Sequence, residues 1–280
     1  MKLDMDYIIP DSVEDISRKL RGRDAYFLAG GTDIMALKKD GMLDDRLWVD
    51  ISGLKDLKGI KQKDDYIRIG ALSIMTEIEK SDLIKENAAA LADAASEMGS
   101  PLIRNLATIG GNLANSSPAG DAIPALCALD AVVNIRSAGS QREIPADEFV
   151  TGPGRNLLEA GEIITSVDIP LYPTSSSGFL KLGSRRALAI SKVSVAAWWV
   201  MADDKIKDIS IFMGAVGPKP LKAPRTEKVL KGEKLLPEKI NKAKETIKTE
   251  ARPIDDFRST AEYCSDMVGV LLERILLKES

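Results

Sequence analysis

The chain of 280 residues contains no histidine. This absence excludes Ser-His-Asp and Cys-His catalysis, a histidine general base and any metal site that needs imidazole ligands. The sequence has two cysteines, Cys127 and Cys264, which cannot supply the four thiolates of an iron–sulfur cluster or a zinc ribbon. We expect both to be buried, as free cysteines usually are. Chemistry on this chain must therefore rest on carboxylates, lysines, a metal held by oxygen or a bound cofactor.

Long apolar runs and an excess of positive charge are also missing. No run approaches the roughly 18 residues that span a bilayer, and residues 1–6 are too acidic and too polar for a signal peptide. The formal net charge is -3, whereas a nucleic-acid surface usually needs a basic excess. We therefore expect a cytoplasmic protein with no membrane span and no nucleic-acid partner.

The first part of the chain predicts a β-α-β arrangement. Asp11 followed by Glu14 is typical of a helix start, and the apolar residues 25–29 and 47–51 are typical of strands. A helix is expected between these strands, and Gly41 is expected to terminate it. Later residues continue with strands predicted at 66–71, 132–136 and 163–169 and helices at 73–80, 87–98 and 122–129.

The pattern changes after residues 172–177, which are the best linker candidate because they combine proline with serine and threonine. Beyond them the strands come first and the helices follow. Strands are expected at 178–182, 193–201 and 206–216, and helices at 224–231, 237–250 and 258–277. This order indicates a separate α+β domain.

Two glycine-containing loops carry residues suited to binding a cofactor. Glycines let backbone N–H groups approach an anion closely, and successive N–H groups in such turns form an anion-binding nest. The first loop also opens onto a helix N-terminus, whose dipole favours phosphate. Two such loops would suit the two phosphates of a dinucleotide. They consist of Leu28, Ala29, Gly30, Gly31, Thr32, Asp33 and Ile34, and of Thr108, Ile109, Gly110, Gly111 and Asn112, the second continuing to Asp121.

A plainer interpretation stays open for either loop taken alone. Gly-Gly pairs are common at turns, so each loop would then be a glycine turn with capping residues. Neither loop has the G-x-G-x-x-G spacing of a Rossmann fingerprint, and the chain contains no Walker A loop.

Taken together, the two loops resemble those of the flavoprotein subunit of the xanthine dehydrogenase and carbon monoxide dehydrogenase family. Five later segments resemble landmarks of that family in the same order: Ser117–Asp121, Phe149–Gly154, Glu162–Ile164, Lys181–Arg186 and Val193–Ala196. Because the resemblance spans nearly the whole chain, the chain is identified as a member of that family.

The resemblance implies an α+β fold, the FAD-binding domain type shared with vanillyl-alcohol oxidase and p-cresol methylhydroxylase. That domain would cover residues 1–172, with two α+β subdomains at about 1–55 and 56–172 and FAD held between them. A smaller α+β C-terminal domain, with an antiparallel sheet and helices, would cover residues 176–280. The two glycine loops would then cradle the pyrophosphate and the adjoining ribose.

The resemblance also gives roles to single residues. Asp121 would contact FAD through hydrogen bonds, although it is equally suited to be the N-cap of a helix that begins at Ala122. Ile164 would offer backbone contacts to the flavin ring. Lys181 would lie near the polar edge of the flavin, where a cation stabilises the reduced form; read alone, it would be a solvated surface lysine. Ile190 either leaves the flavin face open to an electron acceptor or is a core residue.

By the same resemblance, FAD is the cofactor of this chain, and no catalytic residue or metal is needed on it. A large partner subunit would hold the molybdenum cofactor and a small iron–sulfur subunit would carry two [2Fe–2S] clusters. Electrons would pass through FAD to NAD(P)+ or another acceptor. Two other functions stay open: a self-sufficient FAD oxidoreductase on the same fold, and a non-enzymatic assembly subunit that has lost FAD.

Overall fold

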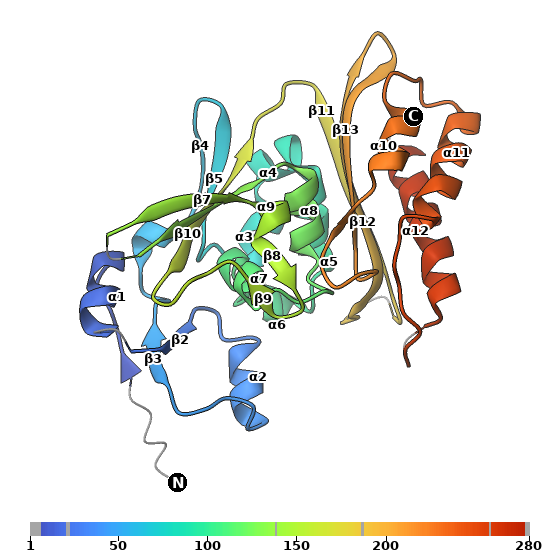
Figure 1. The fold of residues 1–280 in the computed structure, drawn as a ribbon. Helices are drawn as coiled ribbons and strands as arrows, with labels where there is room; N and C mark the ends of the chain where they lie inside the picture. The colour runs from blue at the N-terminus through green and yellow to red at the C-terminus, as the bar shows by residue number, and fades with distance from the viewer. Residues whose placement is uncertain (1–6, 21–22, 138, 186–187, 258, 278–280) are drawn as a thin grey trace.

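The computed structural model describes residues 7–20, 23–137, 139–185, 188–257 and 259–277. The predictions for residues 1–6 and the landmark residue Arg186 lie outside the described residues. The elements form a three-stranded, a five-stranded and a four-stranded sheet, together with a two-stranded pair. Figure 1 shows them as successive lobes, from the small N-terminal sheet to the C-terminal helices.

The N-terminal sheet is parallel, with the order β1-β3-β2. Helix α1 lies between β1 and β2 in the chain, and its apolar residues Val13, Ile16 and Leu20 are buried. Helix α2 follows β2 and contains no buried residue. The predicted β-α-β beginning is confirmed. Its elements are β1 (Tyr7–Ile8), α1 (Val13–Leu20), β2 (Ala25–Leu28), α2 (Ile34–Lys39) and β3 (Leu47–Asp50).

The central sheet is antiparallel and has the order β4-β5-β10-β6-β7. Alternate residues of β5, β6 and β10 are fully buried against a helical layer, whose core also contains Leu91 and Leu126. The strands are β4 (Ile60–Gln62), β5 (Tyr66–Gly70), β6 (Val132–Arg136), β7 (Gln141–Pro145) and β10 (Ile163–Pro170). The helices are α3 (Met75–Lys80), α4 (Asp82–Asn87), α5 (Ala89–Glu97), α6 (Pro101–Arg104), α7 (Ile109–Asn115), α8 (Ala122–Ala128) and α9 (Ala146–Phe149).

The second glycine segment is helical, so the prediction of a loop there is wrong. Thr108 is the N-cap of α7, and its Oγ1 accepts a hydrogen bond from the Gly111 N–H at 3.0 Å. A threonine cap of this kind satisfies one of the N–H groups that a helix start leaves without a partner. The two glycines therefore lie in the first turn of the helix, where their lack of a side chain permits close packing.

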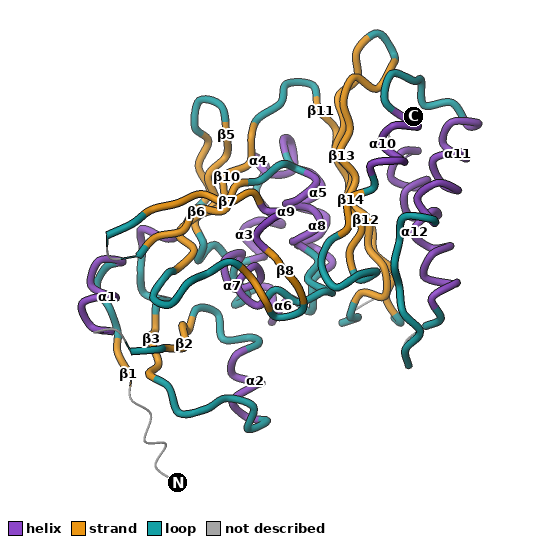
Figure 2. The backbone as a smooth tube through the Cα atoms, viewed as in Figure 1, coloured by secondary structure: helices purple, strands orange, loops and turns teal. Residues whose placement is uncertain are grey.

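The C-terminal sheet is antiparallel, has the order β11-β12-β13-β14 and is covered on both faces (Figure 2). The five-stranded sheet and helices α3 to α9 together form the central domain. Its core also contains residues of the C-terminal sheet, namely Phe179, Ala196, Trp198 and Phe212. Residues on the other face belong to a second core, which includes the last three helices. The elements are β11 (Ser175–Gly183), β12 (Ser191–Ala202), β13 (Lys205–Gly214), β14 (Leu221–Lys222), α10 (Pro224–Leu230), α11 (Pro237–Lys248) and α12 (Ala261–Leu277).

The predicted linker at residues 172–177 is too long, because β11 already begins at Ser175. The Ser177 hydroxyl accepts a hydrogen bond from the Ala90 N–H of α5 at 3.1 Å. Serine is common both in turns and at the polar ends of strands, so composition did not separate the two roles. The C-terminal sheet is therefore joined to the central domain by contacts along β11 as well as by the chain itself.

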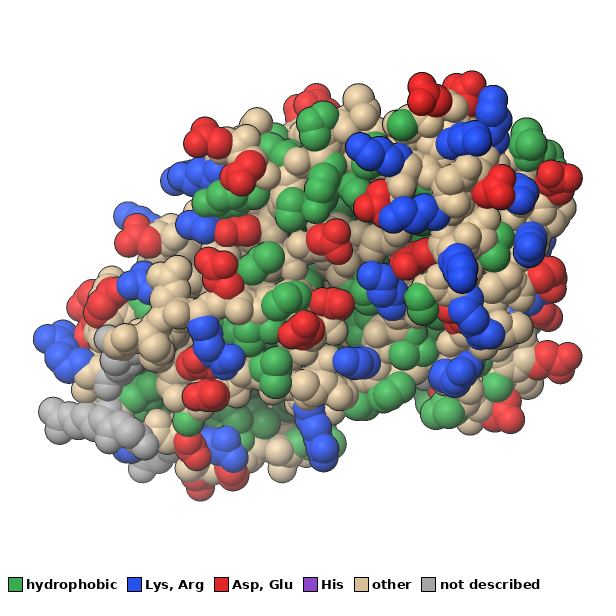
Figure 3. Space-filling view, turned by 45° about the horizontal axis from the view of Figure 1, so that its top comes forward, with side chains coloured by type: hydrophobic (Ala, Val, Ile, Leu, Met, Phe, Trp, Pro, Cys, Tyr) green, Lys and Arg blue, Asp and Glu red, His purple; other side chains and the backbone are tan. Residues whose placement is uncertain are grey.

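The predicted burial of both cysteines is confirmed, with exposed fractions of 2% for Cys127 and 5% for Cys264. Among the described residues, no helix is both long enough and apolar enough to cross a membrane. Figure 3 shows acidic and basic side chains interspersed over the face that it displays. That mixture agrees with a formal net charge of only -3.

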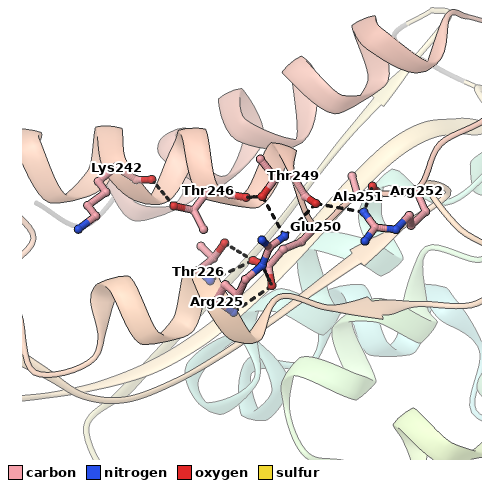
Figure 4. A network of polar contacts seen from close by, with 8 residues as sticks. All are labelled: Arg225, Thr226, Lys242, Thr246, Thr249, Glu250, Ala251 and Arg252. Atoms are coloured by element: carbon pink, nitrogen blue, oxygen red, sulfur yellow. Dashed lines mark hydrogen bonds and ion pairs between the residues drawn. The ribbon is translucent and has the colours of Figure 1, made fainter.

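A carboxylate fixes the start of α10 against the end of α11 (Figure 4). Glu250 accepts hydrogen bonds from the Arg225 and Thr226 N–H groups at 2.9 and 3.0 Å and from the Thr226 hydroxyl at 2.6 Å. Its side chain is only 6% exposed. An anion at a helix N-terminus is favourable because the free N–H groups and the helix dipole both point at it.

We predict that Glu250→Ala lowers the free energy of unfolding by about 2–4 kcal/mol, because two buried donors of Thr226 and the part-buried Arg225 N–H lose their acceptor. Urea denaturation with linear extrapolation measures this change. Glu245→Ala is the control, since Glu245 is 67% exposed and forms a surface ion pair with Lys248. An equal loss in both variants would contradict the capping role of Glu250.

Candidate functional site

A cavity of about 660 Å³ lies between the N-terminal sheet and the helices of the central domain. Both predicted glycine segments contribute to its wall. A volume of this size falls in the range of cofactor and ligand pockets. Most of the predicted site residues line it: Ala29, Gly30, Gly31, Thr32, Asp33, Ile34, Thr108, Gly111, Asn112 and Asp121.

Gly30 lets the two walls of the cavity meet. A Cβ atom at this position would lie 1.9 Å from the Leu106 carbonyl oxygen, which is far inside the contact distance of real side chains. The neighbouring Gly31 has φ +72°, a left-handed conformation that glycine adopts without steric cost. This turn is thus possible only with glycine at Gly30, and it is strained with any other residue at Gly31.

The first glycine segment presents unused backbone donors to the cavity. Among the described residues, the N–H groups of residues 30–34 donate no hydrogen bond within the protein. They lie between the end of β2 and the first turn of α2. Consecutive free N–H groups at a helix start bind anions, because the groups and the helix dipole act together. This geometry suits a phosphate.

The second glycine segment does not form the expected nest. The Ile109 N–H donates to the Ser73 carbonyl and the Gly110 N–H donates to the Ala71 carbonyl, at 3.1 and 2.8 Å. The Gly111 N–H is taken by the cap. The prediction that these amides grip a phosphate is therefore wrong, because packing against the loop after β5 uses them first.

The second glycine segment contributes side chains, those of Asn112 and Thr108, to the cavity. Asn112 lines the cavity, and its buried Oδ1 has no hydrogen-bond partner in the part of the chain that the structure describes. A buried acceptor left unpaired is costly, so such an atom indicates a missing donor. The hydroxyl of Thr108 also lies in this wall.

Asp121 joins the cavity to the C-terminal sheet. Its Oδ2 accepts from the Lys181 ammonium at 2.6 Å and its Oδ1 from the Ser191 hydroxyl at 2.5 Å. The Lys181 and Asp121 side chains are 5% and 7% exposed. Asp121 is the N-cap residue of α8, which begins at Ala122 as predicted, but its side chain makes no capping hydrogen bond to that helix. Lys181 is not a solvated surface lysine.

Burial raises the pKa of Asp121 above its usual value, while the charge and the hydrogen bond of Lys181 and the hydrogen bond from Ser191 act in the opposite direction. The carboxylate thus depends on these two donors to stay ionised.

The remaining predicted residues lie apart from the lining. These residues are Leu28, Ile109, Gly110, Ile164 and Lys181. Ile109 and Ile164 are packed in the core of the central domain, and Lys181 reaches the lining only through Asp121. Ile190 is 66% exposed, so the interpretation as a core residue is wrong. Ile190 is not one of the residues that line the cavity.

The structure adds residues that sequence reasoning missed. Met98 and Ile103 contribute apolar surface to the cavity, and Phe27 and Leu43 do so from the other side. Met98 follows α5 directly, at the end of the helix predicted at 87–98, and nothing in that pattern marks it as a binding residue. Ser191 had no signal at all, because it reaches Asp121 across 70 residues of sequence.

Comparison with known proteins decides the family. The sequence profile described as the FAD binding domain in molybdopterin dehydrogenase matches residues 3–172, and that of the CO dehydrogenase flavoprotein C-terminal domain matches residues 179–278. The chain belongs to this family. It is the FAD-binding medium subunit of a molybdenum hydroxylase, and FAD is its cofactor.

Individual relatives of this flavoprotein agree. It is 37% identical to the nicotinate dehydrogenase FAD-subunit of Eubacterium barkeri, over 82% of this chain and 80% of the relative. It is 30% identical to the nicotine 6-hydroxylase medium subunit of Paenarthrobacter nicotinovorans, over 97% and 96%. In the solved structure of reconstituted CO dehydrogenase from Oligotropha carboxidovorans, a chain 27% identical superposes with a TM-score of 0.93, covering 99% and 98%. The predicted fold class is confirmed.

The residues of the cavity fit FAD. The free N–H groups of residues 30–34 are suited to the pyrophosphate, and the unpaired Asn112 Oδ1 is suited to a donor such as a ribose hydroxyl. Apolar side chains such as Met98 and Ile103 give the surface that an aromatic ring system needs. When bound, FAD supplies the redox chemistry, and the chain supplies binding and orientation.

We predict that Gly30→Ala lowers FAD occupancy of the purified flavoprotein at least about tenfold, because a Cβ atom would push the first glycine turn away from Leu106. Gly53→Ala is the control, since a Cβ there meets nothing within 4 Å. Absorbance near 450 nm per protein chain measures occupancy. Full FAD occupancy in the Gly30 variant would show that FAD binding does not need the close approach of Gly30 to the Leu106 carbonyl.

Proposed function

We propose that this flavoprotein is the electron-transfer subunit of a three-subunit molybdenum hydroxylase. A small partner subunit delivers electrons from two [2Fe–2S] clusters, and a large partner subunit oxidises the substrate at its molybdenum cofactor. When bound, FAD would supply the one- and two-electron chemistry that links these clusters to NAD(P)+ or another acceptor, and the residues of the cavity would hold and orient it. The main observation in support is a cavity that presents free N–H donors and apolar surface but few side chains able to act as an acid or a base.

The cavity lining contains three titratable side chains, Tyr26, Asp33 and Asp121. Tyr26 donates its hydroxyl to Asp44 at 2.6 Å, and both oxygens of Asp121 are occupied. A self-sufficient oxidoreductase needs an acid or base free to act on its own substrate. Of the three, Asp33 is left for such a role. The lining therefore favours an electron-transfer subunit and not a self-sufficient oxidoreductase.

We also propose roles for the predicted residues. The N–H groups of residues 30–34 hold the FAD pyrophosphate, while Thr108 and Asn112 contact the adjoining ribose. Lys181, held by Asp121, places positive charge near the polar edge of the flavin. Residues 1–172 form the FAD-binding domain and residues 176–280 the C-terminal domain; the two subdomains of the first, at about 1–55 and 56–172, enclose the cavity between them.

Gly31→Val should abolish FAD retention, because the turn requires φ +72° and the new side chain would crowd Leu28 and Met35. Gly41→Val is a matched control: Gly41 has φ +70°, but a Cβ there meets nothing within 4 Å. The two variants carry similar backbone strain, and only Gly31 lies in the cavity wall. Visible absorbance after gel filtration reports the flavin content. Equal FAD retention in both variants would show that the first glycine turn does not take part in FAD binding.

Purification of the tagged chain from its native cells tests the complex itself. We expect two further subunits, molybdenum, and about four iron atoms per flavin, as two [2Fe–2S] clusters require. Metal analysis and mass spectrometry give these ratios. Flavin with neither metal would favour the self-sufficient oxidoreductase, and a chain without flavin would favour the assembly subunit.

A further inference from the structure

Strand β12 alternates between the two cores of the protein. Val193, Val195 and Ala197 belong to the core beneath the C-terminal helices, while Ala196 and Trp198 belong to the core of the central domain. Alternation of this kind is the rule along a strand. Continued regularly toward the start of β12, it would place Ser191 on the side of the helices, away from Asp121.

A β-bulge changes the direction of Ser191. Leu182 of β11 pairs with Val193, but the next residue, Gly183, pairs with Ser191, so that Lys192 is an extra residue in β12. Such an insertion reverses the side-chain alternation, and bulges are frequent next to functional sites for this reason. Ser191 therefore faces the central domain and is only 1% exposed.

Lys181 reaches the same point by regular alternation on β11. It lies two residues after Phe179, whose ring is in the core of the central domain. The two strands thus bring an ammonium and a hydroxyl to one carboxylate, with contacts of 2.6 and 2.5 Å to Asp121. The ammonium also donates to the Ala189 carbonyl at 3.3 Å.

We propose that Ser191 is a positioning residue: its hydrogen bond holds the Asp121 carboxylate ionised and fixed against Lys181 at the end of the FAD cavity. The bulge at Lys192 turns the Ser191 hydroxyl toward Asp121. The role in cofactor binding rests on the proposed function, whereas the effect on Asp121 does not.

The physical reason is the cost of a buried charge. A carboxylate removed from water stays ionised only when it is paired and its oxygens receive hydrogen bonds. Lys181 serves one oxygen and Ser191 the other, while Glu97 of α5 adds an unfavourable negative charge. Without the Ser191 hydroxyl, one oxygen is left without its donor, and protonation of Asp121 becomes easier.

A carboxyl NMR titration of the full chain tests this effect directly. With ¹³C-labelled aspartate, the Asp121 signal is assigned by its loss in Asp121→Asn. We expect Ser191→Ala to raise the Asp121 pKa by about one unit, the size of one hydrogen bond to a charged group. Ser191→Thr keeps the hydroxyl and should return the pKa to the wild-type value.

Ser210→Ala is the matched control. Ser210 lies on the neighbouring strand β13 and is 5% exposed, and its hydroxyl finds no hydrogen-bond partner among the described residues. Its removal should leave the Asp121 pKa unchanged. If Ser191→Ala does not fold, Ser191→Cys replaces it with a weaker donor of similar shape and should give a smaller rise. A change below about 0.3 unit in the folded Ser191 variant, or an equal change in the Ser210 variant, overturns the proposal.

The FAD-loaded protein gives the second measurement. Because the folded protein binds the Asp121 proton more tightly than the unfolded chain does, protonation of this group alone does not favour unfolding. Acid release of FAD, followed by flavin fluorescence, should therefore start at a pH about one unit higher in Ser191→Ala, while far-UV circular dichroism stays constant. An unchanged release pH overturns the link to the cavity. Absence of flavin in the wild type contradicts the proposed function alone, and the NMR titration still decides the role of Ser191.

Discussion

The close approach of two backbone segments at Gly30 is the constraint on which the cavity depends. The turn after β2 touches the carbonyl of Leu106, and no side chain fits between them. Because the segments meet there, residues 30–34, whose N–H groups are free, line the same cavity as Thr108, the cap of α7. A parallel sheet and an antiparallel domain thereby form one binding site, although each has its own hydrophobic core.

The two glycine segments look alike in sequence and act differently in the structure. In the first, glycine supplies a left-handed turn and leaves its amides free. In the second, Gly110 packs so closely on Ala71 that a Cβ would lie 2.8 Å from it, and the amides are satisfied inside the protein. One pair of glycines thus serves ligand approach, and the other serves the packing of a helix that carries Asn112.

The C-terminal sheet has a role beyond that of a separate domain. One of its faces completes the core of the central domain, with Trp198 and Phe212 among the contributing side chains. From the same face Lys181 and Ser191 reach Asp121. Apolar burial thus fixes the sheet in place. The fixed sheet keeps Lys181 and Ser191 within hydrogen-bond distance of Asp121, and these donors offset the cost of its buried charge.

The class of the protein could be predicted from the composition, the order of strands and helices, the two glycine segments and the family landmarks. The last three are local features, because periodicity and turn chemistry depend on residues close together in the chain. The folded structure was needed to show that residues 109–115 are helical, that Asp121 binds Lys181 and that Ser191 takes part. Contacts of this second kind join residues 60 or 70 positions apart and depend on the register of strands, where one extra residue at Lys192 reverses the direction of a side chain.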